Sequence, residues 1–436
     1  MHRPTTLGVP AHGRKSTFIT SGWLYDRAGA QEEDGAVSKV SNGRAGHGPE
    51  RAATRRAVRL VPLGLAIATA AVVASSAGAS TNAVGQARSI TAAAEKGYVT
   101  SQTPSSPLFA VKKFPGPKTA PTNAQVPHNK NITFIAAGVP LQYAATLQQR
   151  LTAPLGWHIN YVQTPGTPVA FANGFQQAIA QHPGAIELAG LPDATVVPQI
   201  NAARAAKIKT VATAGPQLVH PGFDAYLSVR FDAIDRVAAN LAISDSNGSA
   251  NVLFAIPSGY TEVDQNAPAF SKALAACSKC KNTTKQYSIP DFLNPVTLQS
   301  NITAALNANP KINYVVDAFD QAPSQPVVNA IRKTGRKIKL ILLNGSLTGL
   351  SMVANGSAIA DVSVASNWIE YAEADDLRRV LAGKPPLPFN GWIGGTHVFT
   401  KANLPATITD ASVARALDAV GPYKAAYQKL WTKGHL

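Results

Sequence analysis

The two cysteines stand three residues apart, in Cys277-Ser-Lys-Cys280. A redox dithiol needs its first thiol at the N-terminus of a helix, where the helix dipole lowers the pKa of the thiol. This pair instead follows the helical pattern of residues 267–276, so it falls at the C-terminal end of a predicted helix. A zinc site would need two further ligands at a recognisable spacing, and none appears. The pair therefore predicts a local disulfide, provided that the chain is exported.

Motifs for other catalytic chemistry are scarce. The sequence has no His-Glu-x-x-His and no P-loop, and its histidines are scattered. In Gly345-Ser-Leu-Thr-Gly349 the serine stands one position too early for the nucleophile elbow of a hydrolase. We expect a binding protein with no catalytic residue, no metal and no cofactor. An exported α/β hydrolase is the third hypothesis, after a transport protein and a sensor.

The elements that would position a site begin at residue 131, where strand-length apolar runs alternate with helical patterns. The first unit has predicted strands at 132–136, 158–162, 185–189 and 209–213 and helices at 143–155, 169–181 and 194–206. The second has strands at 250–256, 285–289, 314–317, 338–343 and 360–364 and helices at 231–242, 267–276, 298–307, 327–333 and 347–354. This order predicts an α/β fold with two doubly wound parallel sheets, whose ligand sites lie beyond the carboxyl ends of the strands.

An export leader precedes this body. Arg51, Arg55, Arg56 and Arg59 stand before the apolar run at 60–74, and Ala77-Gly78-Ala79 offers a cleavage site before Ser80. The run is shorter than the roughly 20 apolar residues of a membrane span. We predict a signal peptide at 51–79, with an uncleaved N-terminal anchor as the alternative. Both the general secretory route and the twin-arginine route remain open.

The flanking segments lack the pattern of a folded core. Residues 1–50 are predicted to be a disordered extension, or to precede the true start of translation at Val37 or Val58. Residues 80–130 are predicted to be a proline-rich linker that builds no core. The net charge of +16 is spread along the chain, so we expect a soluble monomer attracted to an anionic envelope and no nucleic-acid partner.

Several segments of the body resemble ribose-type (type I) periplasmic or extracellular solute-binding proteins, which share their fold with LacI-type repressors. The segments that carry the resemblance are Ala178-Ile-Ala180, Pro183-Gly-Ala-Ile186, Asp193, Ile200–Val211, Ile256-Pro-Ser-Gly259, Phe270–Ala275, Ala308–Val315 and Val328–Gly335. It covers residues 131–399 and implies two lobes joined by a three-stranded hinge. We expect lobe 1 at 131–229 plus 368–395 and lobe 2 at 230–367 plus 396–436. The hinge crossings are expected near 228–231, 366–369 and 394–399, and 410–433 is predicted to be one amphipathic helix.

The resemblance also implies where a ligand would bind. By position, the ligand-binding candidates are Leu141, Gln142, Tyr143, Gly190, Gln217, Arg230, Tyr260, Asp264, Asn266, Phe319, Asp320, Asn344, Asn367 and Trp368. Sugar binders of this family often end the fourth strand in Asp-Arg, whereas this chain has Ala214-Gly215, and Asn266 stands nearest a second missing arginine. The ligand is therefore expected to be a sugar held by amides and aromatic rings, or a less polar solute.

The expected function is capture of a small molecule for the membrane permease of an ABC importer, in the cell envelope, periplasm or extracellular space. The alternative is an extracellular ligand sensor that presents its closed form to a membrane receptor.

Overall fold

The computed structural model describes residues 68–103, 105–137, 142–164, 167–189, 196–215, 222–258, 261–320, 324–388 and 394–436. The predicted extension at 1–50 and the arginines of the leader lie outside these ranges. Among the described residues, no helix combines the length and the apolar character needed to cross a membrane.

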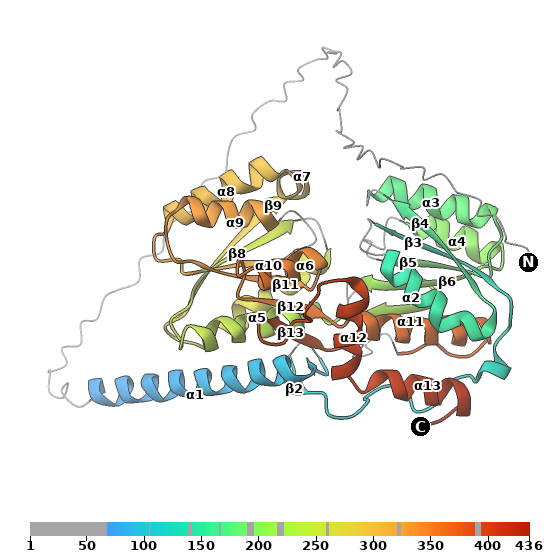
Figure 1. Cartoon of the computed structure of the whole chain (residues 1–436), viewed down its shortest axis with the longest axis horizontal. Coiled ribbons are helices and arrows are strands. Elements are labelled where there is room, and N and C mark those ends of the chain that lie inside the picture. Colours follow the sequence, from blue (N-terminus) through green and yellow to red (C-terminus); the bar gives the residue numbers. More distant parts are fainter. Residues whose placement is uncertain are drawn as a thin grey trace, which may run out of the picture. The chain divides into compact units, whose positions relative to one another are not determined.

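A five-stranded parallel sheet forms the first half of the body (Figure 1). Its strands are β3 (Asn131–Ala137), β4 (His158–Thr164), β5 (Ala185–Ala189), β6 (Lys209–Gly215) and β7 (Ala225–Ser228), in the order β4-β3-β5-β6-β7. The helices beside it are α2 (Gln142–Thr152), α3 (Pro168–Ala180), α4 (Val197–Ala205) and α11 (Ser366–Leu381). Side chains alternate across the strands: Phe134 packs with α2 and α11, and Ile135 packs with α3 and α4. The sheet is therefore covered by helices on both faces, as the sequence predicts.

An eight-stranded sheet forms the second half, in the order β2-β1-β13-β12-β11-β10-β8-β9. Its parallel strands are β8 (Asn251–Ser258), β9 (Lys281–Ser288), β10 (Tyr314–Asp317), β11 (Lys339–Asn344) and β12 (Ala360–Val364). The strands β13 (Thr396–Thr400), β1 (Val99–Thr100) and β2 (Phe109–Ala110) extend it in antiparallel fashion. One face buries α1 (Ala68–Lys96), α5 (Phe231–Asp245) and α6 (Thr261–Leu274). The other buries α8 (Pro295–Ala308), α9 (Ser324–Lys333) and α10 (Leu347–Ala354).

Shorter helices complete the body: α7 (Ile289–Leu293) and the 3₁₀ helices η1 (Asn123–Gln125) and η3 (Ala153–Leu155). The chain passes between the sheets after β7, between β12 and α11, and again before β13. Residues 366–369 were expected to form the second crossing, but they are the first turn of α11. The third expected crossing, at 394–399, mostly forms β13, which pairs with β12.

Residues 80–130 do not behave as the predicted linker. Val84, Ala87 and Ala94 of α1 are buried in the same cluster as α5, and Tyr98 and Phe114 are buried among the aromatic rings of the C-terminal helices. The prediction that this segment builds no core is therefore wrong. It also adds a passage between the sheets that was not predicted, because the chain runs from β2 in one sheet to β3 in the other.

The C-terminal segment forms two helices, α12 (Asp410–Val420) and α13 (Tyr423–Lys433), rather than one. They are separated at Gly421 and Pro422, and a proline lacks the N–H that a continuous helix would need. Both pack against α11, which covers the five-stranded sheet. The expected assignment of 396–436 to lobe 2 stays a prediction.

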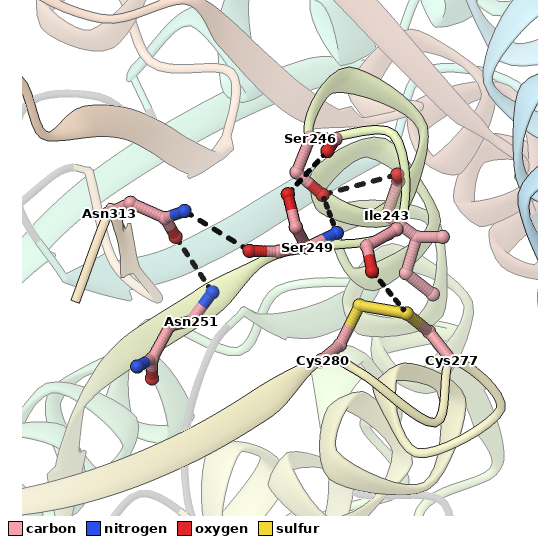
Figure 2. The surroundings of a disulfide bond; sticks show 8 residues. Ile243, Ser246, Ser249, Asn251, Cys277, Cys280 and Asn313 are labelled. Atoms are coloured by element: carbon pink, nitrogen blue, oxygen red, sulfur yellow. Dashed lines mark hydrogen bonds between the residues drawn. A yellow bond between two sulfur atoms is a disulfide. The ribbon is translucent and has the colours of Figure 1, made fainter. Parts of the chain in front are cut away.

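Cys277 and Cys280 are joined at the end of α6, with their Cα atoms 5.3 Å apart (Figure 2). The Cys277 Sγ lies 3.3 Å from the carbonyl oxygen of Gly248, in the turn after α5. The next residue, Lys281, begins β9. The pair therefore fixes the turn between α6 and β9 at the amino edge of the sheet, away from the carboxyl ends of the strands.

Thiol labelling tests this pairing. Native exported protein is expected to show no free cysteine, and denatured, reduced protein is expected to show two, because a bridge here closes without moving the backbone. Two thiols that react readily in the native protein would contradict the bridge.

Candidate functional site

The carboxyl ends of the parallel strands meet at one edge of each sheet. In the five-stranded sheet, Ala137 pairs with Thr164, and Ala136 with Ala189. In the eight-stranded sheet, Asp317 pairs with Leu342, and Asn344 with Ser363. Sheets of this type bind ligands at these edges, so the candidate site is built from the loops that follow them.

Many of the expected ligand contacts stay predictions. Leu141, Gly190, Gln217 and Tyr260 lie outside the described residues. A second group lies on described helices without described side chains: Gln142 and Tyr143 in the first turn of α2, and Asp264 and Asn266 in α6.

Asn344 has the most unusual backbone at this edge. Its φ is +99°, in a region that side chains with a Cβ rarely adopt, and Gly345 follows with φ +79°. A Cβ at residue 345 would collide with Ser363 on β12, so the turn requires glycine there. The Asn344 Nδ2 donates a hydrogen bond to the carbonyl oxygen of Ala318, 3.2 Å away. Strain of this kind is concentrated at functional sites, and Asn344 is only partly buried.

Phe319 also lies at the end of a strand, directly after β10. Its ring is partly exposed and packs beside the core of the eight-stranded sheet. Its backbone N–H donates to the Oδ1 of Asp317 at 3.3 Å. The structure therefore keeps Phe319 next to Asn344, through the carbonyl oxygen of Ala318.

Asp320 has a structural role at this edge. Its side chain is fully buried, and its Oδ2 accepts the backbone N–H of Ser346, the N-cap of α10, at 2.7 Å. Asp361 accepts the N–H of Gly345 at 2.9 Å, and the two carboxyl groups hydrogen-bond to each other. Asp320 is fully buried and its Oδ2 has partners within the chain, so its expected ligand contact stays a prediction. Asp320 positions the turn that carries Asn344.

Burial determines the protonation of this carboxyl pair. Loss of solvent raises the pKa of Asp320 to about 6 and raises the pKa of Asp361 well above its usual value. Asp317 is also fully buried, and burial raises its pKa to about 6 although Ser324 Oγ donates to it at 2.8 Å. Burial therefore favours the protonated form of Asp361, which hydrogen-bonds to Asp320.

A family model described as a periplasmic binding protein domain matches residues 125–385. The chain belongs to the periplasmic binding protein family. No curated protein gives a significant match by sequence.

Solved structures share the fold of this periplasmic binding protein, which is type I. An ABC transporter solute-binding protein from Agrobacterium vitis, bound with alpha-D-tagatopyranose, is 18% identical over 66% of this chain and 98% of its own, with a TM-score of 0.56. A periplasmic ribose ABC transporter protein from Conexibacter woesei is 14% identical over 66% of this chain and 95% of its own, with a TM-score of 0.55. A carbohydrate transporter from Acidothermus cellulolyticus, in complex with myo-inositol, is 18% identical over 67% and 99%, with a TM-score of 0.53.

At the first crossing of this periplasmic binding protein, Arg230 is held by its own chain. It makes two hydrogen bonds with the carboxylate of Asp232, at 2.7 and 2.9 Å, and donates to Ser101 Oγ at 2.8 Å. Arg236 donates to the same Ser101 Oγ at 3.2 Å and to the carbonyl oxygen of Ser106 at 2.7 Å. Arg230 was expected to contact a ligand, but these bonds instead fix the N-terminal segment to the crossing.

Trp368 and Asn367 are likewise buried in the core of the family fold. The ring of Tyr423 stacks on Trp368 at 5.2 Å between centroids, and that of Phe114 stacks at 6.2 Å. Asn367 Nδ2 donates to the carbonyl oxygen of Ala414 and to Asp418. The expectation that Trp368 stacks on a ligand is not supported by this geometry, since its side chain is fully buried among aromatic rings.

Proposed function

We propose that this protein is exported and captures a small molecule between the carboxyl edges of its two sheets, for delivery to the permease of an ABC importer. The observation that carries the proposal is the family match over residues 125–385. The strained, partly exposed Asn344 at the carboxyl edge supports the same location. The similar structures from Agrobacterium vitis and Acidothermus cellulolyticus hold a sugar and a polyol, which favours a solute of this class.

The polar groups at this edge suggest how such a solute would be bound. The Asn344 amide and the Phe319 ring stand at neighbouring strand ends of the eight-stranded sheet. The strand β6 ends in Ala214 and Gly215, so it provides no charged pair for ring hydroxyls. We infer a ligand bound by amide hydrogen bonds and aromatic contact: a sugar or a polyol, or a less polar relative of one.

The N-terminal segment is compatible with cleavage of the leader before Ser80. The buried side chains described in α1 begin at Val84, and Ala87 and Ala94 follow on the same face. Cleavage after Ala79 would keep all of them in the mature protein. We therefore propose a mature chain that begins at Ser80 and keeps the packed part of α1.

A ligand screen tests the function. We expect at least one compound, among sugars, polyols, purines and aromatic acids, to raise the melting temperature, because it binds only the folded state. Asn344→Ala is expected to weaken binding of that compound by about 1–3 kcal/mol through loss of a hydrogen-bond partner. Lys333→Ala, at an exposed position of α9, is the control and should bind normally.

Closure between the lobes gives a second measurement. A ligand that contacts both lobes favours a closed state, so the radius of gyration from small-angle scattering should fall on binding. An unchanged radius together with normal binding by Asn344→Ala would show that the ligand does not bind at these strand ends.

A further inference from the structure

Three carboxylates meet inside the layer between the five-stranded sheet and its helices. Glu187 stands on β5, and Glu370 and Glu373 stand one turn apart on α11. Each is at most 5% exposed, and one carboxylate oxygen from each lies within 4.8 Å of the others. None of the three was predicted as a functional residue, because they are far apart in the sequence and only the fold brings them together.

A fourth polar group points into the cluster from α2. Gln148 is fully buried, and its Nε2 donates to the Oε2 of Glu370 at 3.1 Å and to the backbone oxygen of Glu370 at 2.9 Å. Its Oε1 has no hydrogen-bond donor among the described residues. An amide oxygen without a donor, on a fully buried side chain, is an independent sign of a missing hydrogen-bond donor or cation.

The carboxylates themselves lack donors in the same way. Both oxygens of Glu187 and both oxygens of Glu373 have no donor among the described residues, apart from a carboxyl–carboxyl contact between the two side chains. None of the ion pairs found in the described part of the chain involves this cluster. The neighbouring charge that faces Glu373 is another acid, Asp376. The Asp320–Asp361 pair differs, because backbone N–H groups donate to both of its members.

A buried carboxylate without a donor must be neutralised by a proton or a cation. Burial raises the pKa of Glu187 to about 7 and that of Glu370 to about 8, and it raises the pKa of Glu373 well above its usual value. Without a cation, burial therefore favours the protonated form of all three groups.

We propose that Glu187, Glu370, Glu373 and the Oε1 of Gln148 bind a calcium ion. Carboxylate and amide oxygens are the ligands that calcium takes, at roughly 2.3–2.6 Å, so oxygens on opposite sides of the ion lie about 5 Å apart. One oxygen from each carboxylate lies within 4.8 Å of the others, which is close enough for a single ion to contact all three. Glu187 and Glu373 can each bind through two oxygens, and Glu370 and Gln148 can each add one, which gives the six ligands at the lower end of the range for calcium.

Other metals fit this ligand set less well. Magnesium is smaller and usually keeps several waters, which a fully buried cluster has little room to hold. Zinc favours nitrogen and sulfur ligands, and this cluster contains only oxygens. A calcium ion here would connect α11 to β5 and α2, directly after the crossing at Ala365, and so fix the helix on which the C-terminal helices pack. The proposal replaces the expectation that the chain binds no metal.

The test begins with purified mature protein treated with a chelator. Added calcium is expected to bind with a stoichiometry of one per chain in equilibrium dialysis and to raise the melting temperature. The rise should be larger at pH 8 than at pH 5.5, because calcium requires ionised carboxylates and binding releases their protons. Without calcium, stability gained from the raised pKa values is present at low pH and is lost as the pH rises through about 7 and 8.

Substitutions separate this site from adventitious binding. Glu187→Gln with Glu373→Gln should abolish both the bound calcium and the thermal response, whereas Asp410→Asn, an exposed control on α12, should keep both. If that double variant does not fold, the single variant Glu187→Gln is measured in its place, and it should lose the bound calcium and the thermal response.

The proposal is overturned if the unaltered protein binds no calcium and its melting temperature does not respond at either pH. The proposal is also overturned if calcium binds equally to the double variant, because the bound calcium would then lie on the surface. A response to manganese but not to calcium would overturn the choice of metal. A double variant more stable than the unaltered protein at pH 8, with no calcium response in either, would show a cluster neutralised by protons alone.

Discussion

A chain that begins at residue 131 is expected to be unfolded or aggregated, although it contains all five strands of one sheet and the five parallel strands of the other. Truncation removes Tyr98, Val99 and Phe114 from the core, together with the buried face of α1. It also exposes the edge of β13 with which β1 pairs, and an unpaired edge promotes aggregation.

The expected size of this effect follows from the buried side chains. Each large apolar side chain contributes about 1.5–3 kcal/mol when fully buried. The loss of Tyr98, Phe114, Val126 and the buried face of α1 therefore amounts to about 10 kcal/mol, which is comparable to the 5–15 kcal/mol stability of a typical domain.

A second truncation is the matched control for the first. A chain that begins at Ser80 keeps every buried residue described in the N-terminal segment, so it should express in soluble form and unfold cooperatively. Circular dichroism and urea unfolding distinguish the two chains. A stable, monomeric protein that begins at residue 131 would show that the segment packs without contributing to the fold.

The N-terminal segment also shows what sequence reasoning missed, and why. Val84, Ala87, Thr91 and Ala94 recur at the spacing of one helix face, and all four are buried. Alanines and a threonine give a weak hydrophobic signal, and the prolines that follow suggested a linker. The strands were easier to predict: β5, β10 and β12 begin and end at the predicted residues.

The helix α11 was not predicted because of its high density of acidic residues. It carries Glu370, Glu373, Asp375 and Asp376, and acids of this density normally mark a solvated surface. Here all four are buried. One of them is neutralised by the fold: Asp375 bonds Arg379 at 2.7 Å and Trp431 at 2.9 Å. Arg379 lies one turn further along the same helix, but Trp431 comes from a distant part of the chain, which the sequence pattern could not reveal.

The candidate site was predicted at the level of strand ends rather than of side chains. The alternation of predicted strands and helices indicates where the carboxyl ends of the strands lie. The sequence could not show which partners the fold gives to Asp320, Arg230 and Trp368. For all three the partner is another residue of this chain.

Replacing Trp368 with alanine is expected to destabilise the protein by about 3–5 kcal/mol, the usual cost of removing a buried large aromatic ring. The indole lies between the rings of Tyr423 and Phe114 and makes an edge contact with Tyr98 at 5.7 Å. Its removal leaves a cavity where the N-terminal segment, α11 and α13 meet. Urea unfolding of the variant measures the loss. Phe109→Ala is the control, because that ring is 40% exposed and should cost far less.

The same variant decides between a core role and a ligand role for Trp368. If the ring belongs to the core, Trp368→Phe should recover much of the lost stability, because a smaller aromatic ring refills part of the cavity. Each folded molecule of Trp368→Phe should then bind the ligand found in the screen as tightly as the unaltered protein does. Full stability in Trp368→Ala combined with lost ligand binding would instead support the original expectation of stacking. That result would require the stacked rings to separate when the ligand binds, since both of them cover the indole in this structure.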